Sequence, residues 1–115
     1  MTNEELEAYL ETLGWKLERR VVSSQTFIVI RNYVIPMGSL AGRICDVAIE
    51  RVSAVPYVAP AAIHTRPALV PMDTSALRTM QSALGPDWQY WSRLVRGQPT
   101  PQRMVAHIAT IFSEV

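Results

Sequence analysis

Cys45 is the single cysteine of the chain and the only candidate for a thiol nucleophile. It lies in "RICDVAIERV", residues 43–52, where β-branched residues predict a strand. Strand alternation places Cys45 on the same face as Val47 and Ile49. Burial there would raise the thiol pKa, and the neighbouring Asp46 would raise it further. We therefore expect Cys45 to be an unreactive core residue, and no catalytic residue is assigned.

The other residue types that often carry chemistry form no pattern of their own. His64 and His107 lie far apart and belong to no HxH or HExxH arrangement, so a structural role is expected for each. The segment "GSLAG", residues 38–42, lacks the lysine and the strand-to-helix context of a phosphate-binding loop. No serine lies in a nucleophile elbow. We therefore expect neither a metal site nor a cofactor.

Aromatic residues gather in "WQYWSR", residues 88–93. Trp88 and Trp91 stand three positions apart, which predicts that they share one side of a helical turn. Large aromatic side chains anchor cores and also dominate binding interfaces. We expect Trp88 and Trp91 to be structural core residues. Tyr90 and Arg93 would then form an exposed edge where a partner could bind.

The N-terminal residues predict a helix and the residues after it predict strands. Thr2 and Glu5 form a capping box, and an apolar stripe from Leu6 to Leu13 ends at Gly14. Three runs rich in β-branched and aromatic residues follow, separated by turn-forming residues, and they predict an antiparallel meander of three to four strands. These runs cover residues 15–22, 26–35 and 43–52.

A proline-rich extended segment separates the meander from the end of the chain. Four prolines between Pro56 and Pro71 leave room for at most one short edge strand, around residues 61–64. Residues 74–84 have weak helical spacing. A closing helix begins at Thr100 and Pro101 and has one apolar face. The order of elements predicts an α+β fold in which both helices pack on the sheet.

Length and composition indicate one globular domain over residues 1–115. The chain is 49% hydrophobic and 18% charged, with a net charge of +1, which favours neither nucleic acid nor an anionic membrane as a partner. No apolar run approaches the roughly 20 residues of a membrane span. The acidic, amphipathic start is unlike a signal peptide, so we expect a cytoplasmic protein, monomeric or a simple oligomer.

Three stretches together resemble a known family. They are "VIRNYVIPMG", "CDVAIERVSAVPYVAPAAIHTRP" and "WQYWSR", followed by the closing helix. This succession, from about Trp15 to Val115, resembles bacterial members of the ubiquitin-conjugating (UBC) superfamily, prokaryotic family E. The tryptophan-serine-arginine run is the most distinctive part. The resemblance implies a UBC-like fold, in which a helix packs on an antiparallel meander and a proline-rich segment precedes the final helices.

The resemblance also implies a place in a bacterial ubiquitin-like modification pathway, sometimes one of antiviral defence. Its partners would be a ubiquitin-like protein and a ThiF-like activating enzyme. The chain departs from conventional UBC enzymes, because Pro56 and Tyr57 reverse the usual tyrosine-proline pair and neither a histidine-proline-asparagine motif nor a cysteine follows Pro71. It also departs from the bacterial family, in which a histidine tends to follow the serine-arginine pair, where this sequence has Leu94. We therefore predict a non-catalytic adaptor.

The predicted partner surface comprises Tyr57, Pro60, Tyr90 and Arg93. Two alternatives stay open. The chain could form a thioester through Cys45, which requires an exposed thiol beside a positive group such as Arg43. It could also resemble the dimeric secretion chaperones, which bind unfolded effectors through apolar patches. Those chaperones tend to be strongly acidic, whereas the isoelectric point here is about 7.9.

Overall fold

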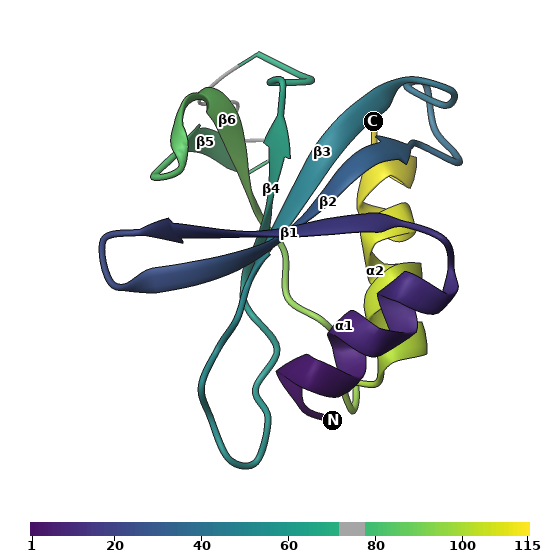
Figure 1. Ribbon diagram of the computed structural model, residues 1–115. Coiled ribbons are helices and arrows are strands. Elements are labelled where there is room, and N and C mark those ends of the chain that lie inside the picture. Colours follow the sequence, from purple (N-terminus) through teal and green to yellow (C-terminus); the bar gives the residue numbers. More distant parts are fainter. Residues whose placement is uncertain (72–77) are drawn as a thin grey trace.

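Both helices pack on one face of a single antiparallel sheet (Figure 1). The computed structural model describes residues 1–71 and 78–115. The elements are α1 (Asn3–Thr12), β1 (Lys16–Val22), β2 (Gln25–Val34), β3 (Ile44–Glu50), β4 (Ala62–Arg66), β5 (Thr79–Ser82), β6 (Gly85–Ser92) and α2 (Pro101–Ser113). The strand order across the sheet is β1-β2-β3-β4-β6-β5. The predicted α+β class is confirmed, and the sheet has more strands than the three or four predicted.

The two helices begin where the sequence signals place them. Thr2 Oγ1 accepts a hydrogen bond from the Glu5 backbone N–H at 3.1 Å, and Thr100 Oγ1 accepts one from Arg103 N–H at 3.1 Å. Each cap satisfies a backbone donor that the first turn leaves unpaired. Pro101 occupies the first helical position of α2. Both helix predictions are confirmed.

The predicted meander corresponds to β1, β2 and β3, which pair in chain order. The loop between β2 and β3 folds back onto the C-terminal end of α2, where Ser39 N–H donates to Val115 O at 2.8 Å. Gly38 has φ +84°, and a Cβ at this position would overlap the carbonyl oxygen of Phe112. Glycine therefore permits both the backbone conformation and the close approach of the loop.

The second half of the sheet differs from the prediction. The expected edge strand is β4, and it lies inside the sheet between β3 and β6. Residues 79–82 form strand β5 rather than helix, and residues 74–77 of the same predicted segment lie outside the described residues. The tryptophan cluster is on strand β6 rather than on a helical turn. Pairing with distant strands therefore overrides the local spacing in this half of the chain.

Apolar residues form a separate cluster on each face of the sheet. The larger cluster lies between the sheet and the helices and includes Leu6, Leu10, Ile108 and Phe112. The smaller one comprises Phe27, Val29, Ala48, Leu84 and Trp88 and lies on the opposite face, which no helix of the described residues covers and which we call the helix-free face.

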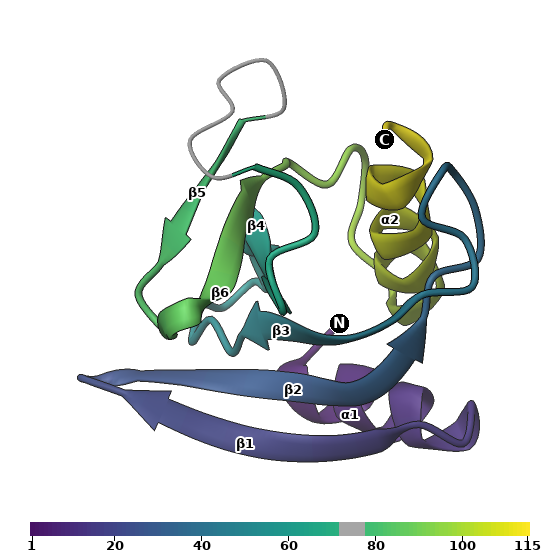
Figure 2. The same ribbon diagram turned by 90° about the horizontal axis from the view of Figure 1, so that it is seen from above.

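Curvature of the sheet covers the smaller cluster. Figure 2 shows β6 running steeply across the direction of β1 and β2. The Arg20 guanidinium of β1 donates to the carbonyl oxygen of Leu84, between β5 and β6, at 2.9 Å. The two ends of the sheet therefore approach each other over the helix-free face. No helix in the described part of the chain is long and apolar enough to cross a membrane.

Candidate partner-binding site

Cys45 lies on the central strand β3 with 3% of its surface exposed. Its backbone pairs with that of Tyr33 on β2, and its side chain belongs to the cluster beneath the helices. Burial raises the pKa of the thiol to about 12, the Asp46 charge raises it further, and Arg43 lowers it only in part. The thiol is therefore protonated near neutral pH and shielded from solvent.

Trp88 and Trp91 lie on opposite faces of β6. Trp91 is fully buried beneath α2, where its ring centroid is 6.0 Å from that of Phe112 and its Nε1–H donates to Thr65 Oγ1 at 3.0 Å. Trp88 is 2% exposed and belongs to the cluster on the helix-free face. The expectation that the two tryptophans share one side is wrong. Residues three apart on a strand point to opposite faces, because side chains alternate with a period of two.

Asp46 holds a polar network next to Trp88. Its carboxylate accepts hydrogen bonds from Arg66 at 2.8 Å, from Arg31 at 3.2 Å and from the Asn32 backbone N–H at 3.1 Å. Burial acts to raise the pKa of Asp46, but the Arg66, Asn32 and Arg31 contacts outweigh it and hold the pKa below its ordinary value. The Arg66 guanidinium lies 4.6 Å from the Trp88 ring centroid. The network thus fixes a cation over the indole.

Tyr90 is half-buried on the helix-free face and packs against His64, with ring centroids 5.3 Å apart. His64 Nδ1 lies 2.7 Å from Ser82 Oγ, which also accepts the Leu84 backbone N–H. The Ser82 hydroxyl hydrogen is therefore available to His64. Burial lowers the pKa of His64 to about 4, so the ring is neutral near pH 7. The His64 ring therefore supports the Tyr90 side chain by packing against it. Met80, the cross-strand neighbour of Tyr90 on β5, is 52% exposed.

Arg93 is buried, with 5% of its surface exposed, so its expected place at an exposed edge is wrong. Its Nε donates to Glu114 at 3.1 Å, and its Nη1 donates to the carbonyl oxygen of Ser92 at 2.8 Å. These partners offset the cost of removing a guanidinium from water. The sequence could not indicate that Glu114 pairs with Arg93, because Glu114 is 21 positions away at the end of α2.

Arg93 lines a pocket of about 530 Å³ between α2 and the segment that follows β6. Three further arginines, Arg78, Arg96 and Arg103, also line it. Arg103 Nη1 donates to the Arg96 carbonyl oxygen at 3.2 Å and so steadies the segment. Sequence reasoning missed these three residues. For Arg96 and Arg103 the available signal was the density of arginine between residues 93 and 103, which forms a site only because α2 lies beside the segment after β6. No local pattern indicated Arg78, which precedes β5.

Tyr57 and Pro60 lie in the loop between β3 and β4. Tyr57 is half-buried, and burial raises its pKa. Its hydroxyl is buried and has no hydrogen-bond partner in the described residues. The Arg93 backbone N–H donates to Ala61 O at 2.9 Å, which brings the Pro60 end of this loop beside Arg93. Tyr90 is on the helix-free face, so the four predicted partner-binding residues do not form one surface.

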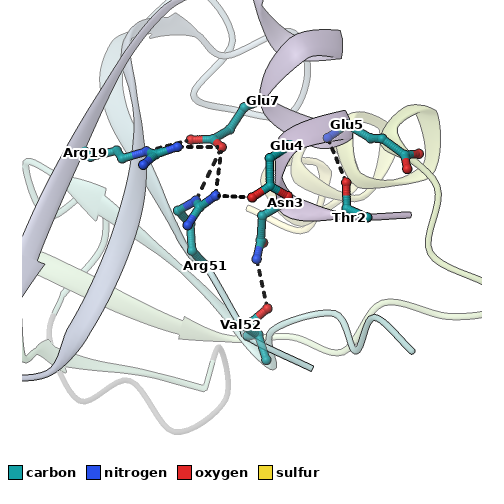
Figure 3. Close-up of polar contacts among 8 residues, drawn as sticks. All are labelled: Thr2, Asn3, Glu4, Glu5, Glu7, Arg19, Arg51 and Val52. Atoms are coloured by element: carbon teal, nitrogen blue, oxygen red, sulfur yellow. Dashed lines mark hydrogen bonds and ion pairs between the residues drawn. The ribbon is translucent and has the colours of Figure 1, made fainter. Parts of the chain in front are cut away.

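Ion pairs tie the first turns of α1 to the sheet (Figure 3). Glu7 contacts Arg19 of β1 at 3.1 Å and Arg51, just after β3, at 3.2 Å. Arg51 also reaches Glu4 at 3.0 Å, and the Asn3 side chain donates to Val52 O at 2.9 Å. Glu4 and Glu7 on the acidic face of α1 therefore make contacts within the molecule.

The helix, the antiparallel sheet and the closing helix are together consistent with a UBC-like fold. The chain belongs to prokaryotic E2 family E, whose model matches residues 3–115. No curated protein and no solved structure matches this chain. Membership in this family confirms the resemblance and supports a role in a bacterial ubiquitin-like pathway.

Proposed function

We propose that this protein is a non-catalytic binding component of a bacterial ubiquitin-like pathway. It would bind a ubiquitin-like protein or its ThiF-like activating enzyme and hold it for a later step. The observation that carries the proposal is the burial of Cys45, the only thiol of the chain, on the central strand of the sheet. In this proposal the protein works in the cytoplasm, and antiviral defence is one setting for such pathways.

Thioester transfer requires a thiolate that can reach the acyl carbon of a donor. A thiol with a pKa of about 12 supplies little thiolate near neutral pH. Reaching Cys45 would also require separating β3 from the helices that cover it, at the cost of the larger apolar cluster. Both the protonation state and the position of Cys45 therefore support binding rather than transfer.

The direct test mixes the protein with a ThiF-like activating enzyme, a ubiquitin-like protein and ATP. We expect no reductant-sensitive adduct, and we expect unmodified protein to co-elute with one of the two partners in size-exclusion chromatography. Cys45→Ser is the matched variant and should co-elute equally well. An adduct that forms with the parent protein and is lost in Cys45→Ser would establish the thioester-forming alternative instead.

A labelling experiment tests the burial of the thiol separately. A bulky maleimide should modify Cys45 slowly in the native protein and rapidly after denaturation, because labelling must wait for the sheet to open. Rapid labelling of the native protein would contradict the proposal. A stable dimer that binds unfolded effector proteins but neither pathway partner would point to the secretion-chaperone alternative.

A further inference from the structure

The pocket beside α2 brings together side chains from three separate parts of the chain. Arg78 precedes β5, Arg93 and Arg96 follow β6, and Arg103 lies on the first turns of α2. The volume of about 530 Å³ is within the range of roughly 300–1,000 Å³ that is usual for ligand pockets. Four guanidinium groups around one hollow are a site for a negatively charged ligand.

Within the described residues, the positive charge in this pocket is only partly balanced. Glu114 is the one acidic residue among the described residues of the lining, and it is paired with Arg93. Arg78, Arg96 and Arg103 make no ion pair with any carboxylate in the described part of the chain. Elsewhere Arg19, Arg31, Arg51 and Arg66 each have a carboxylate partner. The pocket therefore holds three cations that an incoming anion could bind.

Apolar side chains share the lining with the arginines. Leu94 is 75% exposed at the pocket, and Val95 and Ala106 contribute further apolar surface. Phosphate or a nucleic acid backbone would leave this surface unused, and the net charge of +1 provides no general attraction for nucleic acid. A peptide that carries carboxylates next to apolar side chains would satisfy both parts of the lining.

We propose that this arginine pocket binds an acidic segment of a protein partner, one in which carboxylate side chains alternate with apolar ones. The assignment rests on the proposed function, because it names the surface on which a pathway partner would dock. The arginines would hold the carboxylates, and Leu94 with its apolar neighbours would receive the apolar side chains. Ordered guanidiniums such as that of Arg103, fixed to the Arg96 carbonyl, lose little freedom on binding.

The acidic surface of a second copy is a poorer occupant. Along α1 and β1, Glu4, Glu7 and Glu18 already pair with an arginine of their own chain. Glu5 and Glu11 make no ion pair within the described residues, but they stand six positions apart on α1 and so point to different sides of the helix. A second copy could therefore offer several carboxylates at once only by giving up existing ion pairs. A partner with uncommitted carboxylates has no such cost, so we assign the pocket to a different protein.

The test uses a short fluorescent peptide of alternating glutamate and leucine, with fluorescence anisotropy as the measurement. Arg78→Glu combined with Arg96→Glu should weaken binding of this peptide by about tenfold or more. Arg43→Glu combined with Lys16→Glu is the matched control, because it makes the same charge change at exposed residues outside the pocket. Thermal melting of each variant confirms that it is folded.

Two further probes separate the ligand classes. A peptide with glutamine in place of glutamate should bind at least about tenfold more weakly. Added NaCl should weaken the binding of the acidic peptide, because salt screens the attraction between carboxylates and guanidinium groups. Inorganic phosphate and a single-stranded DNA oligonucleotide should not displace the peptide at matched concentrations. The assignment would be wrong if phosphate or DNA displaced the peptide, or if the glutamine peptide bound equally well. It would also be wrong if the control variant lost as much affinity as the pocket variant, or if the parent protein did not bind the acidic peptide.

The pocket and the proposed function can fail separately. A Cys45-dependent adduct would overturn the non-catalytic role while leaving peptide binding at the pocket intact. Conversely, the variant with Arg78→Glu and Arg96→Glu could still co-elute with a pathway partner as well as the parent does. The proposed function would then stand, and the pocket would not be the surface that binds this partner.

Discussion

The side-chain amide of Gln89 forms a pair of hydrogen bonds with the backbone of Val70. Its Nε2 donates to Val70 O at 2.9 Å and its Oε1 accepts from Val70 N–H at 3.3 Å. The same oxygen accepts the Leu69 N–H at 2.9 Å. Gln89 is fully buried on β6, so one side chain supplies the hydrogen bonds that this segment after β4 would otherwise lack.

Gln89→Met should therefore destabilise the protein by about 3 kcal/mol, because it keeps the size of the side chain but leaves buried backbone groups unpaired. Urea unfolding would measure this difference. Gln81→Met is the control, since Gln81 is the exposed cross-strand neighbour of Gln89 on β5 and should change stability by less than about 0.5 kcal/mol. Equal effects of the two substitutions would contradict the role of Gln89.

Trp91→Ala should cost about 3–5 kcal/mol, the range for emptying a large aromatic site in a core. The substitution removes the contact with Phe112 and leaves Thr65 Oγ1 without its indole donor. Leu94→Ala, at a position that is 75% exposed, should be nearly neutral. Thermal unfolding would compare the two variants, and a Trp91→Ala protein that melts like the parent would refute the anchoring role.

Gly38→Ala should be more destabilising than Gly42→Ala, although both glycines have positive φ. At Gly42 the added methyl group meets open space, so the cost is the backbone strain of about 1 kcal/mol. At Gly38 the methyl group would also overlap the Phe112 carbonyl, which adds about 1–3 kcal/mol as the loop is displaced from α2. Chemical denaturation would measure both, and similar costs would show that the loop yields easily.

Stability should fall as the pH drops from 6.5 towards 4, because His64 is buried in its neutral form. Its folded pKa of about 4 is below the ordinary 6.5, so in this window the unfolded chain binds a proton that the folded protein does not. The slope expected from one such group is about 1.4 kcal/mol per pH unit. Burial also lowers the pKa of His107, which adds a change of the same sign.

Unfolding by urea at a series of pH values would measure this dependence. His64→Gln should remove most of the slope, whereas His107→Gln should remove a smaller share, since His107 is only half-buried. A His64→Gln protein with the slope of the parent would show that groups other than His64 cause the acid sensitivity between pH 6.5 and 4.

Local signals in the sequence were enough for the first half of the fold and for α2. The caps at Thr2 and Thr100 and the runs of β-branched and aromatic residues in β1 to β3 are local signals, and the structure has these elements where predicted. The central position of β4 could not be predicted in this way. Its flanking prolines suggested an edge, and its place between β3 and β6 depends on partners far along the chain.

The tryptophan cluster and the pocket show a second limit of sequence reasoning. A spacing of three between Trp88 and Trp91 fits a helical turn as well as a strand, and only the pairing of β6 with β4 and β5 decides between them. Arg93 was predicted to be exposed because a helical turn that buries Trp88 and Trp91 on one side would leave Arg93 at its edge. Its burial depends on Glu114, whose proximity no local pattern reveals.

Strand β6 contributes Trp91 to the apolar cluster under the helices and Trp88 to the cluster on the helix-free face. If β6 separates from the sheet, both apolar clusters lose a tryptophan and become exposed to water together. We therefore expect the two halves of the core to melt together in a single cooperative transition, despite lying on opposite sides of the sheet.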